Sequence, residues 1–134
     1  QFGVFSHIIT DRNRITERMK APFFAPHSRH TFTARQDVEK VPELTIAAES
    51  RKAGVYLMVD KKKHRVFVTG HSEYEADTLS FEYFRDLNKG LPIEVPVNYF
   101  PEDNPDNPPL CTWKEHSEAL YTAWVASLQT GEDL

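Results

Sequence analysis

The chain has 134 residues, 40% hydrophobic and 27% charged, which fits one compact soluble domain and is too short for two full ones. Sixteen Lys and Arg stand against twenty Asp and Glu, a net charge of −4, so the basic excess of nucleic-acid and anionic-membrane binders is missing. No apolar run approaches the roughly 20 residues that span a bilayer. Cys111 is the only cysteine, which excludes an internal disulfide. We expect a cytoplasmic protein.

The first predicted strand, residues 3–9, starts almost at the first residue. Gln1 leads directly into this apolar, β-prone stretch without an initiating Met. A strand at a chain terminus usually needs a partner strand. We therefore expect the chain to be cut from a longer polypeptide, with the partner upstream.

Three more strands are predicted at residues 44–48, 55–59 and 65–69. Each is a short run rich in Val, Ile, Leu and Phe, bounded by turn formers. The charged residues 60–64 form a connector short enough for an antiparallel hairpin. As a basic patch this connector is unremarkable in size, and we interpret it as a solvated turn and not a phosphate site.

Helical periodicity replaces the alternating pattern after Gly70. Four apolar residues define one face of a helix that ends near Gly90: Ala76, Leu79, Tyr83 and Leu87. Residues 72–75 fit a capping box at its start, and residues 112–115 fit another at the start of a second helix. The buried stripe of the second helix is predicted to be Leu120, Trp124 and Leu128.

The segment between the two helices, residues 91–110, contains six prolines. So many prolines are incompatible with regular structure, and we expect a surface segment. Its apolar residues should point inward; they are Val95, Val97, Tyr99 and Phe100.

The strongest chemical signal lies where the strand at 65–69 gives way to the first helix. There Gly70 is followed by His71, Ser72 and Glu73. In an extended segment, side chains two residues apart project to the same side. His71 and Glu73 can therefore meet at the carboxyl end of a strand, the edge where open α/β sheets bind ligands. A carboxylate that accepts one imidazole N–H fixes the tautomer and supports the imidazolium. The pattern predicts a general base that needs a nucleophile.

The tripeptide alone is weak support for catalysis. Six His and twenty acidic residues in 134 produce about one His-x-acid match by chance. His116 and Glu118 form such a match, but residues two apart in a helix diverge by about 200°. We therefore interpret His116 as structural, and only its strand-end placement favours His71.

Residues 22–30 combine two prolines with polar side chains that include His27, Ser28 and His30. Such a segment fits a surface turn or a loop that lines a ligand site, and the pattern does not decide between them. His27 and His30 have a spacing that suits a metal on a helix, but Pro26 and the lack of a nearby acidic ligand argue against zinc. We predict no metal site.

Two further candidates have ordinary explanations beside the functional ones. Glu82 and Arg85 share a helix face, either as a solvated ion pair of little energetic value or as a clamp whose guanidinium and carboxylate match an amino-acid zwitterion.

Cys111 precedes a helix without the strand-to-helix turn of an activated nucleophile. We do not expect Cys111 to be reactive.

Five blocks of the sequence and two single residues resemble the C-terminal half of homoserine O-acyltransferases. They follow that family's order across nearly the whole chain, and together they are far more specific than any one alone. The blocks are residues 25–29, 54–57, 67–79, 84–86 and 98–101, with Trp113 and His116.

The resemblance implies a three-layer α/β fold like that of class I glutamine amidotransferases, with a flavodoxin-like sheet. Residues 1–134 would be the C-terminal part of a single acyltransferase domain whose N-terminal half is missing. The implied reaction moves a succinyl or acetyl group from coenzyme A to the hydroxyl of L-homoserine, toward methionine. Acyl-coenzyme A is then a co-substrate, and no bound cofactor is expected. The implied partners are the N-terminal half and a second copy in a homodimer, without nucleic acid or membrane.

The resemblance also assigns roles to the candidate residues. His71 matches the catalytic base and Glu73 its acidic partner, in a Cys-His-Glu triad that works through an acyl-thioester. Ser28 and Arg85 match substrate-contact positions. Glu82 is our own addition, from the zwitterion argument.

The departures from the family pattern limit what this chain can do alone. The family's nucleophilic cysteine lies upstream of the matched segment, and Cys111 is not at its position, so we expect the chain by itself to be inactive. Ser72 stands where the family commonly has Pro. Two alternatives stay open: another class I amidotransferase-like enzyme, and a degenerate, non-catalytic domain that binds a small metabolite or a protein.

Overall fold

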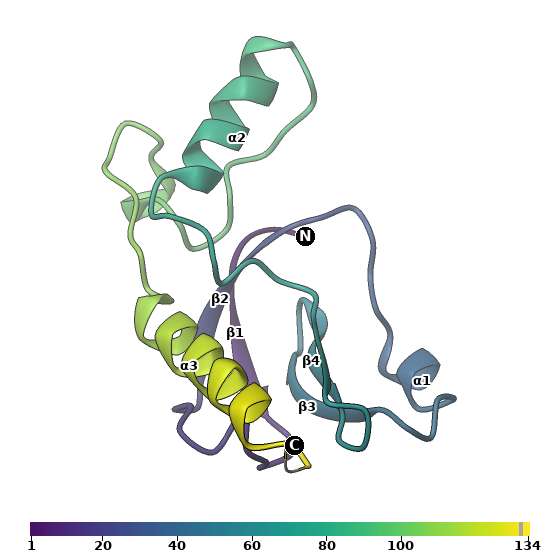
Figure 1. Cartoon of the computed structure of the whole chain (residues 1–134). Helices are drawn as coiled ribbons and strands as arrows, with labels where there is room; N and C mark the ends of the chain where they lie inside the picture. The colour runs from purple at the N-terminus through teal and green to yellow at the C-terminus, as the bar shows by residue number, and fades with distance from the viewer. Residues whose placement is uncertain (132) are drawn as a thin grey trace.

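A computed structural model describes residues 1–131 and 133–134. Its centre is a five-stranded sheet in the order β2-β1-β3-β4-β5 (Figure 1). The strands are β1 (Phe2–Ile9), β2 (Phe23–Ser28), β3 (Thr45–Ser50), β4 (Gly54–Asp60) and β5 (Arg65–Val68). The four predicted strands are confirmed, with ends shifted by at most two residues. Residues 61–64 join β4 to β5 in the predicted antiparallel hairpin.

Strand β2 occupies part of the segment that we interpreted as a turn or a ligand loop. It pairs with β1 over its whole length, with Pro26 opposite Val4. Proline cannot donate a hydrogen bond to a sheet and is confined to edge strands. Since β2 is at the edge of the sheet, the backbone of Pro26 can face away from β1. The prolines that suggested a loop are therefore compatible with a strand at this one place.

The mixed α/β composition is confirmed, and the pairings between the described strands are antiparallel. A flavodoxin-like sheet is mostly parallel. The difference follows from the connections, because the few residues between β3 and β4 and between β4 and β5 can join only antiparallel neighbours. The sheet is also strongly curled, so that the segment after β5 returns to the opposite edge. There the His71 backbone N–H donates to the Pro26 carbonyl at 2.8 Å.

Helices flank the sheet on both faces. They are α1 (Arg35–Val38), α2 (Thr78–Asn88), the 3-10 turn η1 (Pro101–Asp103) and α3 (Lys114–Thr130). Val38 of α1 packs with Met58, whereas Leu120 of α3 packs with Leu57 and Val59; neighbouring residues of a strand point to opposite faces. Within the described residues, no helix is both long and apolar enough to cross a membrane.

Both predicted capping boxes are wrong. Helix α2 begins only after Asp77 and α3 begins after Trp113, and neither N-cap side chain makes a capping hydrogen bond. The Ser72 hydroxyl, expected to cap α2, instead bonds the Tyr56 hydroxyl at 2.5 Å. The Ser72 hydroxyl therefore makes a long-range hydrogen bond in the core in place of the expected bond to the backbone of α2.

The predicted buried stripe of α3 is correct only at its start. Leu120 is buried, but Trp124 is 39% and Leu128 57% exposed. Each step of four residues turns about 40° past a full helical turn, so the later positions rotate away from the sheet. The buried residues of α3 are His116, Leu120 and Ser127. Leu87, predicted to lie on the apolar face of α2, is 46% exposed.

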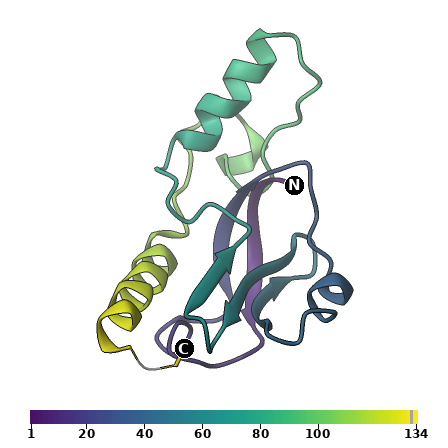
Figure 2. The same ribbon diagram turned by 45° about the vertical axis from the view of Figure 1, so that its right-hand side comes forward.

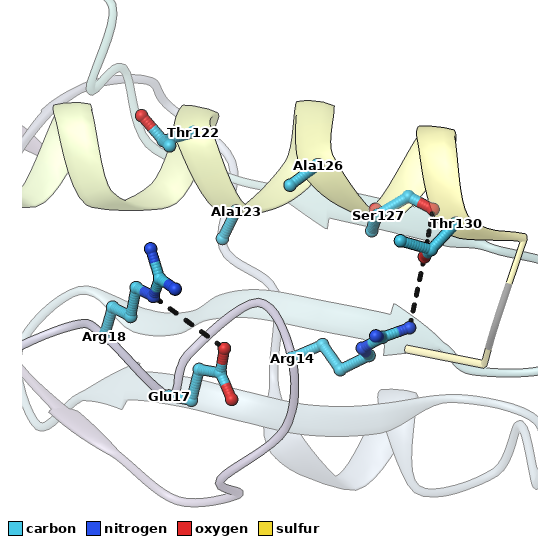
Figure 3. Close-up of a pocket in the computed structure, with 8 residues that line it drawn as sticks. All are labelled: Arg14, Glu17, Arg18, Thr122, Ala123, Ala126, Ser127 and Thr130. Atoms are coloured by element: carbon cyan, nitrogen blue, oxygen red, sulfur yellow. Dashed lines mark hydrogen bonds and ion pairs between the residues drawn. The ribbon is translucent and has the colours of Figure 1, made fainter.

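The connection between β1 and β2 supports the second half of α3. Its residues Arg14, Glu17 and Arg18 face the helix across a cavity of about 210 Å³ (Figure 3). Arg14 donates a hydrogen bond to the Thr130 hydroxyl at 3.2 Å, which joins this connection to the end of α3.

Helix α2 and the proline-rich segment form a lobe beyond the end of the sheet that carries the N-terminus (Figures 1 and 2). A separate core holds the lobe to β1 and α3: Val4, Leu79, Tyr83, Tyr99, Phe100 and Trp113. The inward direction predicted for Tyr99 and Phe100 is confirmed, whereas Val97 is 40% exposed. Val97 contributes its backbone instead, by exchanging hydrogen bonds with β1 at Phe2 and Val4.

Gly3 is required where this segment meets β1. Its φ is +134°, and a Cβ there would lie 2.3 Å from the backbone N of Val97. We expect Gly3→Ala to lower the free energy of unfolding by roughly 3 kcal/mol or more, through backbone strain and the steric clash together. Urea denaturation measures the effect. Gly90→Ala is the control, because Gly90 also has positive φ but nothing within 4 Å of a Cβ; an equal loss in both variants would contradict the close approach.

Candidate functional site

The candidate site is the segment between β5 and α2, residues 69–77, where the curled sheet meets its own edge. The start of the segment is fixed by hydrogen bonds to β4: the Thr69 backbone N–H donates to Tyr56 O at 2.9 Å, and the Thr69 hydroxyl donates to Val55 O at 2.7 Å. The bond from His71 to Pro26 then fixes it to β2. The segment is thus held from two strands that are not neighbours in the sheet.

Gly70 lets this segment pass close over the aromatic core. A Cβ at Gly70 would lie 2.8 Å from the Tyr56 ring and 3.0 Å from the His27 ring. Any larger residue would push the backbone away from these rings and would displace His71, the next residue.

His71 and Glu73 meet as predicted, but in a turn and not in an extended segment: β5 ends at Val68, and the Tyr74 N–H donates to the His71 carbonyl at 3.1 Å. Nδ1 of His71 lies 2.8 Å from Oε1 of Glu73, and the side chains are 36% and 53% exposed. The His71 ring stacks on Tyr74, with 4.5 Å between centroids and 14° between planes. The Tyr121 hydroxyl of α3 donates to Oε2 of Glu73 at 3.3 Å. Both carboxylate oxygens therefore have partners.

This geometry suits an imidazole base. A carboxylate at Nδ1 holds the proton on that nitrogen, so Nε2 carries the lone pair that can accept a proton. Within the part of the chain that the structure describes, Nε2 has no hydrogen-bond partner. The basic nitrogen is therefore free to meet a reactant from outside these residues.

A cluster of buried polar side chains lies beneath the pair. Its members are His7, His27, Tyr56, Ser72 and His116. The Nε2 atoms of His7 and His27 are 3.0 Å apart, and the Tyr56 hydroxyl lies 2.8 Å from Nε2 of His116. His116 is thus a core histidine, as predicted, and makes no pair with Glu118.

The three buried histidines are neutral in the folded protein. Burial lowers the pKa of His7 to about 4 and the pKa values of His27 and His116 to about 3. Nδ1 of His27 accepts a hydrogen bond from Nε of Arg29 at 3.2 Å, and a guanidinium can only donate. The proton of His27 is therefore on Nε2, where it is donated to His7.

Two of the predicted substrate residues line one cavity. Ser28, at the end of β2, and Arg85, on α2, face a space of about 800 Å³ with the apolar residues Phe2, Phe5 and Val95 on its walls. His30 also lines this space, whereas His27 is buried in the cluster below. The structure therefore separates the two histidines that were considered as metal ligands.

The predicted clamp of Glu82 and Arg85 is not formed as an ion pair. Nε and one terminal nitrogen of Arg85 donate to the two oxygens of Asp86 at 2.6 and 2.9 Å. Glu82 accepts from the Tyr74 hydroxyl at 2.9 Å, and its other oxygen is buried without a partner among the described residues. Asp86, which the sequence did not single out, shares the cavity with Arg85.

Cys111 is exposed in the segment before α3. It lines a second cavity of about 420 Å³, to which Glu73 and Trp113 also contribute. Sequence reasoning gave no role to Tyr56, although it lies in one of the blocks that carry the resemblance, and did not single out Tyr121. Their contacts bridge 16 and 48 residues of chain, and no local pattern signals a partner at such a distance.

Comparison with known proteins identifies similar sequences. The model of the homoserine O-succinyltransferase family matches residues 1–131. The chain is 48% identical over 125 residues to homoserine O-acetyltransferase 1 of Ilyobacter polytropus, covering 92% of this chain and 41% of the relative. A homoserine O-acetyltransferase of Geobacillus kaustophilus is 50% identical with the same coverage, and that of Clostridium acetobutylicum is 45% identical, with 42% of the relative covered. The chain thus spans about two fifths of the length of these relatives.

Proposed function

Because the chain belongs to the homoserine O-succinyltransferase family, we propose that it is part of an enzyme that transfers an acyl group from acyl-coenzyme A to the hydroxyl of L-homoserine. The observation that carries the proposal is the pair of His71 and Glu73, 2.8 Å apart at the surface. The His71 side chain is 36% exposed and its Nε2 has no hydrogen-bond partner among the described residues, so it is open to a nucleophile and a substrate.

The proposed nucleophile is a cysteine thiolate supplied from outside these 134 residues. Its proton having passed to Nε2 of His71, the thiolate attacks the thioester carbonyl of acyl-coenzyme A and forms an acyl-enzyme; the bond to the coenzyme A sulfur breaks, and that sulfur takes the proton from His71. The homoserine hydroxyl then attacks the acyl-enzyme and gives its proton to Nε2 of His71. The enzyme thiolate leaves and recovers a proton from His71. Glu73 supports the imidazolium in between.

Homoserine recognition is assigned to the cavity that Ser28 and Arg85 line. An amino-acid carboxylate fits the planar fork of a guanidinium, and the Ser28 hydroxyl can bond either end of the substrate. Glu82, three residues before Arg85 on α2, is proposed for the ammonium group from the zwitterion argument alone, since it is not among the described residues that line this cavity. Asp86 keeps Arg85 oriented through two hydrogen bonds.

The proposal includes the remainder of the domain. The relatives are more than twice as long as the matched segment, which supports an N-terminal half that carries the nucleophile. In this arrangement the curled sheet is one side of a three-layer, amidotransferase-like fold, and the assembled enzyme is a homodimer. The chain alone is then inactive.

Reconstitution tests this proposal. The chain is combined with the N-terminal segment that corresponds to the relatives, and O-acylhomoserine is measured with succinyl- and acetyl-coenzyme A in turn. We expect product from one donor, an acyl adduct on the N-terminal part by mass spectrometry, and no turnover from the chain alone. Folded halves that associate but yield no product with either donor would refute the proposed function.

Substitution of Arg85 tests the substrate site separately. Arg85→Ala is expected to raise the KM for homoserine by roughly 10- to 100-fold, the value of one or two charge-assisted hydrogen bonds, and to leave formation of the acyl-enzyme unchanged. Arg65→Ala is the matched control, because Arg65 is an exposed arginine on β5. An unchanged KM in Arg85→Ala would remove Arg85 from the substrate site.

A further inference from the structure

The residue between His71 and Glu73 points into the protein. His71, Ser72, Glu73 and Tyr74 form a turn, closed by the Tyr74 N–H on the His71 carbonyl at 3.1 Å. Within it the side chains of His71 and Glu73 are partly exposed, whereas Ser72 is only 2% exposed. Its hydroxyl lies 2.5 Å from the hydroxyl of Tyr56. The pair is thus joined directly to a buried hydrogen-bond network.

Tyr56 is the centre of that network. It lies on β4, its side chain is fully buried, and its hydroxyl also lies 2.8 Å from Nε2 of His116. A phenol has one proton, so it donates to one of these neighbours and accepts from the other. The His116 ring is itself held by Phe23, against which it stacks with centroids 4.0 Å apart.

The hydrogen-bond network fixes the segment that carries His71 and Glu73, which has few other contacts to hold its backbone. Residues 69–77 belong to neither helix nor strand. Among the described residues, the His71 backbone is held from outside this segment by one hydrogen bond, to Pro26; its carbonyl accepts only from the Tyr74 N–H within the segment itself. If the backbone turned about its own axis at Ser72, His71 and Glu73 would move together. The bond from Ser72 to Tyr56 opposes that turn, since it would pull a buried hydroxyl from its partner.

We propose that Ser72, Tyr56 and His116 are positioning residues that hold the His71–Glu73 pair in its reactive orientation. This inference rests on the proposed function of the pair and gives a positioning role to three residues to which neither the resemblance nor the comparisons assign one. A purely structural network would stabilise the fold without affecting the reaction, and the experiment separates these roles.

The test is a double-mutant cycle of Ser72→Ala and Tyr56→Phe in the reconstituted enzyme, at saturating acyl-coenzyme A. Each variant removes one hydroxyl from the same bond. We expect each to lower kcat by roughly 5- to 50-fold with the KM for homoserine within about 3-fold of the parent, and the double variant to resemble the worse single one. The Cε1–Hε1 NMR signal of His71 should shift in both single variants.

Ser127→Ala is the matched control. Ser127 is also a buried serine, but its hydroxyl bonds the Trp124 carbonyl within α3. We expect its kcat and its His71 signal to be those of the parent, even where stability falls. If Tyr56→Phe does not fold, Ser72→Ala decides by its kcat and its His71 signal.

Two results would overturn the inference: a parental kcat in Ser72→Ala, or losses that multiply in the double variant. Failure of the proposed function is distinguished by His71→Ala. If His71→Ala retains full acyl transfer, the role of the pair is wrong; if it is inactive while Ser72→Ala is parental, only the positioning role is wrong.

Discussion

Replacement of His71 by alanine is expected to lower kcat for acyl transfer by about 10³- to 10⁴-fold in the reconstituted enzyme. A positioned general base contributes about 10²- to 10⁴-fold to such reactions, and His71 would act in both half-reactions. The geometry supports the upper part of this range because Glu73 holds Nδ1 at 2.8 Å and Nε2 has no hydrogen-bond partner among the described residues. Steady-state rates of O-acylhomoserine formation measure the loss.

Glu73→Gln separates orientation from charge. The glutamine side chain can still reach Nδ1 but can present its amide NH₂ as well as its oxygen, and it no longer stabilises an imidazolium. We expect a loss of about 10²-fold or more in kcat, with little effect on folding because Glu73 is half exposed. Its other partner, the Tyr121 hydroxyl, can donate to a glutamine oxygen as well.

His64→Asn is the control for both variants. His64 lies in the turn between β4 and β5 with φ of +52°, a conformation that asparagine also tolerates. The acyl-transfer activity of the His64→Asn variant should equal that of the parent enzyme. Activity of His71→Ala within 10-fold of the parent would show that the proton is taken by another group, and the proposed mechanism would fail at its central step.

The pair could be predicted from sequence because it depends on local geometry alone. The spacing predicted an extended segment, whereas β5 ends at Val68 and residues 71–74 form a turn closed by the Tyr74 N–H on the His71 carbonyl. The contact forms nonetheless, because residues two apart in a turn are also within reach of each other. The same reasoning found β3, β4 and β5 and their hairpin, since alternation and turn formers are local signals. What surrounds the pair is not local. Tyr56 and His116 are 60 residues apart, and only the curl of the sheet brings β4, α3 and the site segment together.

The errors have the same origin. Ser72 has the sequence signature of a helix cap, but its hydroxyl forms a hydrogen bond with the Tyr56 hydroxyl instead. Pro26 suggested a loop, yet an edge strand accepts it and even uses its carbonyl to hold His71. At both positions a long-range contact outweighed a correct local preference, and both contacts belong to the candidate site.

The second large effect concerns stability against acid. Burial lowers the pKa of His7 from 6.5 to about 4, and those of His27 and His116 from 6.5 to about 3. Below pH 6.5 the unfolded chain therefore binds more protons at these histidines than the folded protein does, so acid favours unfolding. Their full stabilisation is present above pH 6.5 and is lost as the pH falls toward the folded-state pKa values.

The size of this effect follows from the number of histidines. Each proton taken up on unfolding is worth about 1.4 kcal/mol per pH unit, so three histidines together approach about 4 kcal/mol per pH unit once the pH is well below 6.5. A domain with a free energy of unfolding of about 5 to 15 kcal/mol would lose most of it at this slope within a few pH units. We expect the free energy of unfolding to fall steeply between pH 6 and about 4.5.

Urea titrations at constant ionic strength, in steps from pH 7.5 to 4.5, measure this slope. His116→Gln should lower it by about one third, because a glutamine amide can still bond Tyr56 but does not titrate. His30→Gln, at an exposed histidine, should leave the slope unchanged. Most carboxylates titrate near pH 4, so the interval from pH 6.5 to 5 reports on histidines. A free energy of unfolding that stays constant over that interval, or an equal slope in His116→Gln, would mean that the buried histidines do not remain neutral in the folded protein.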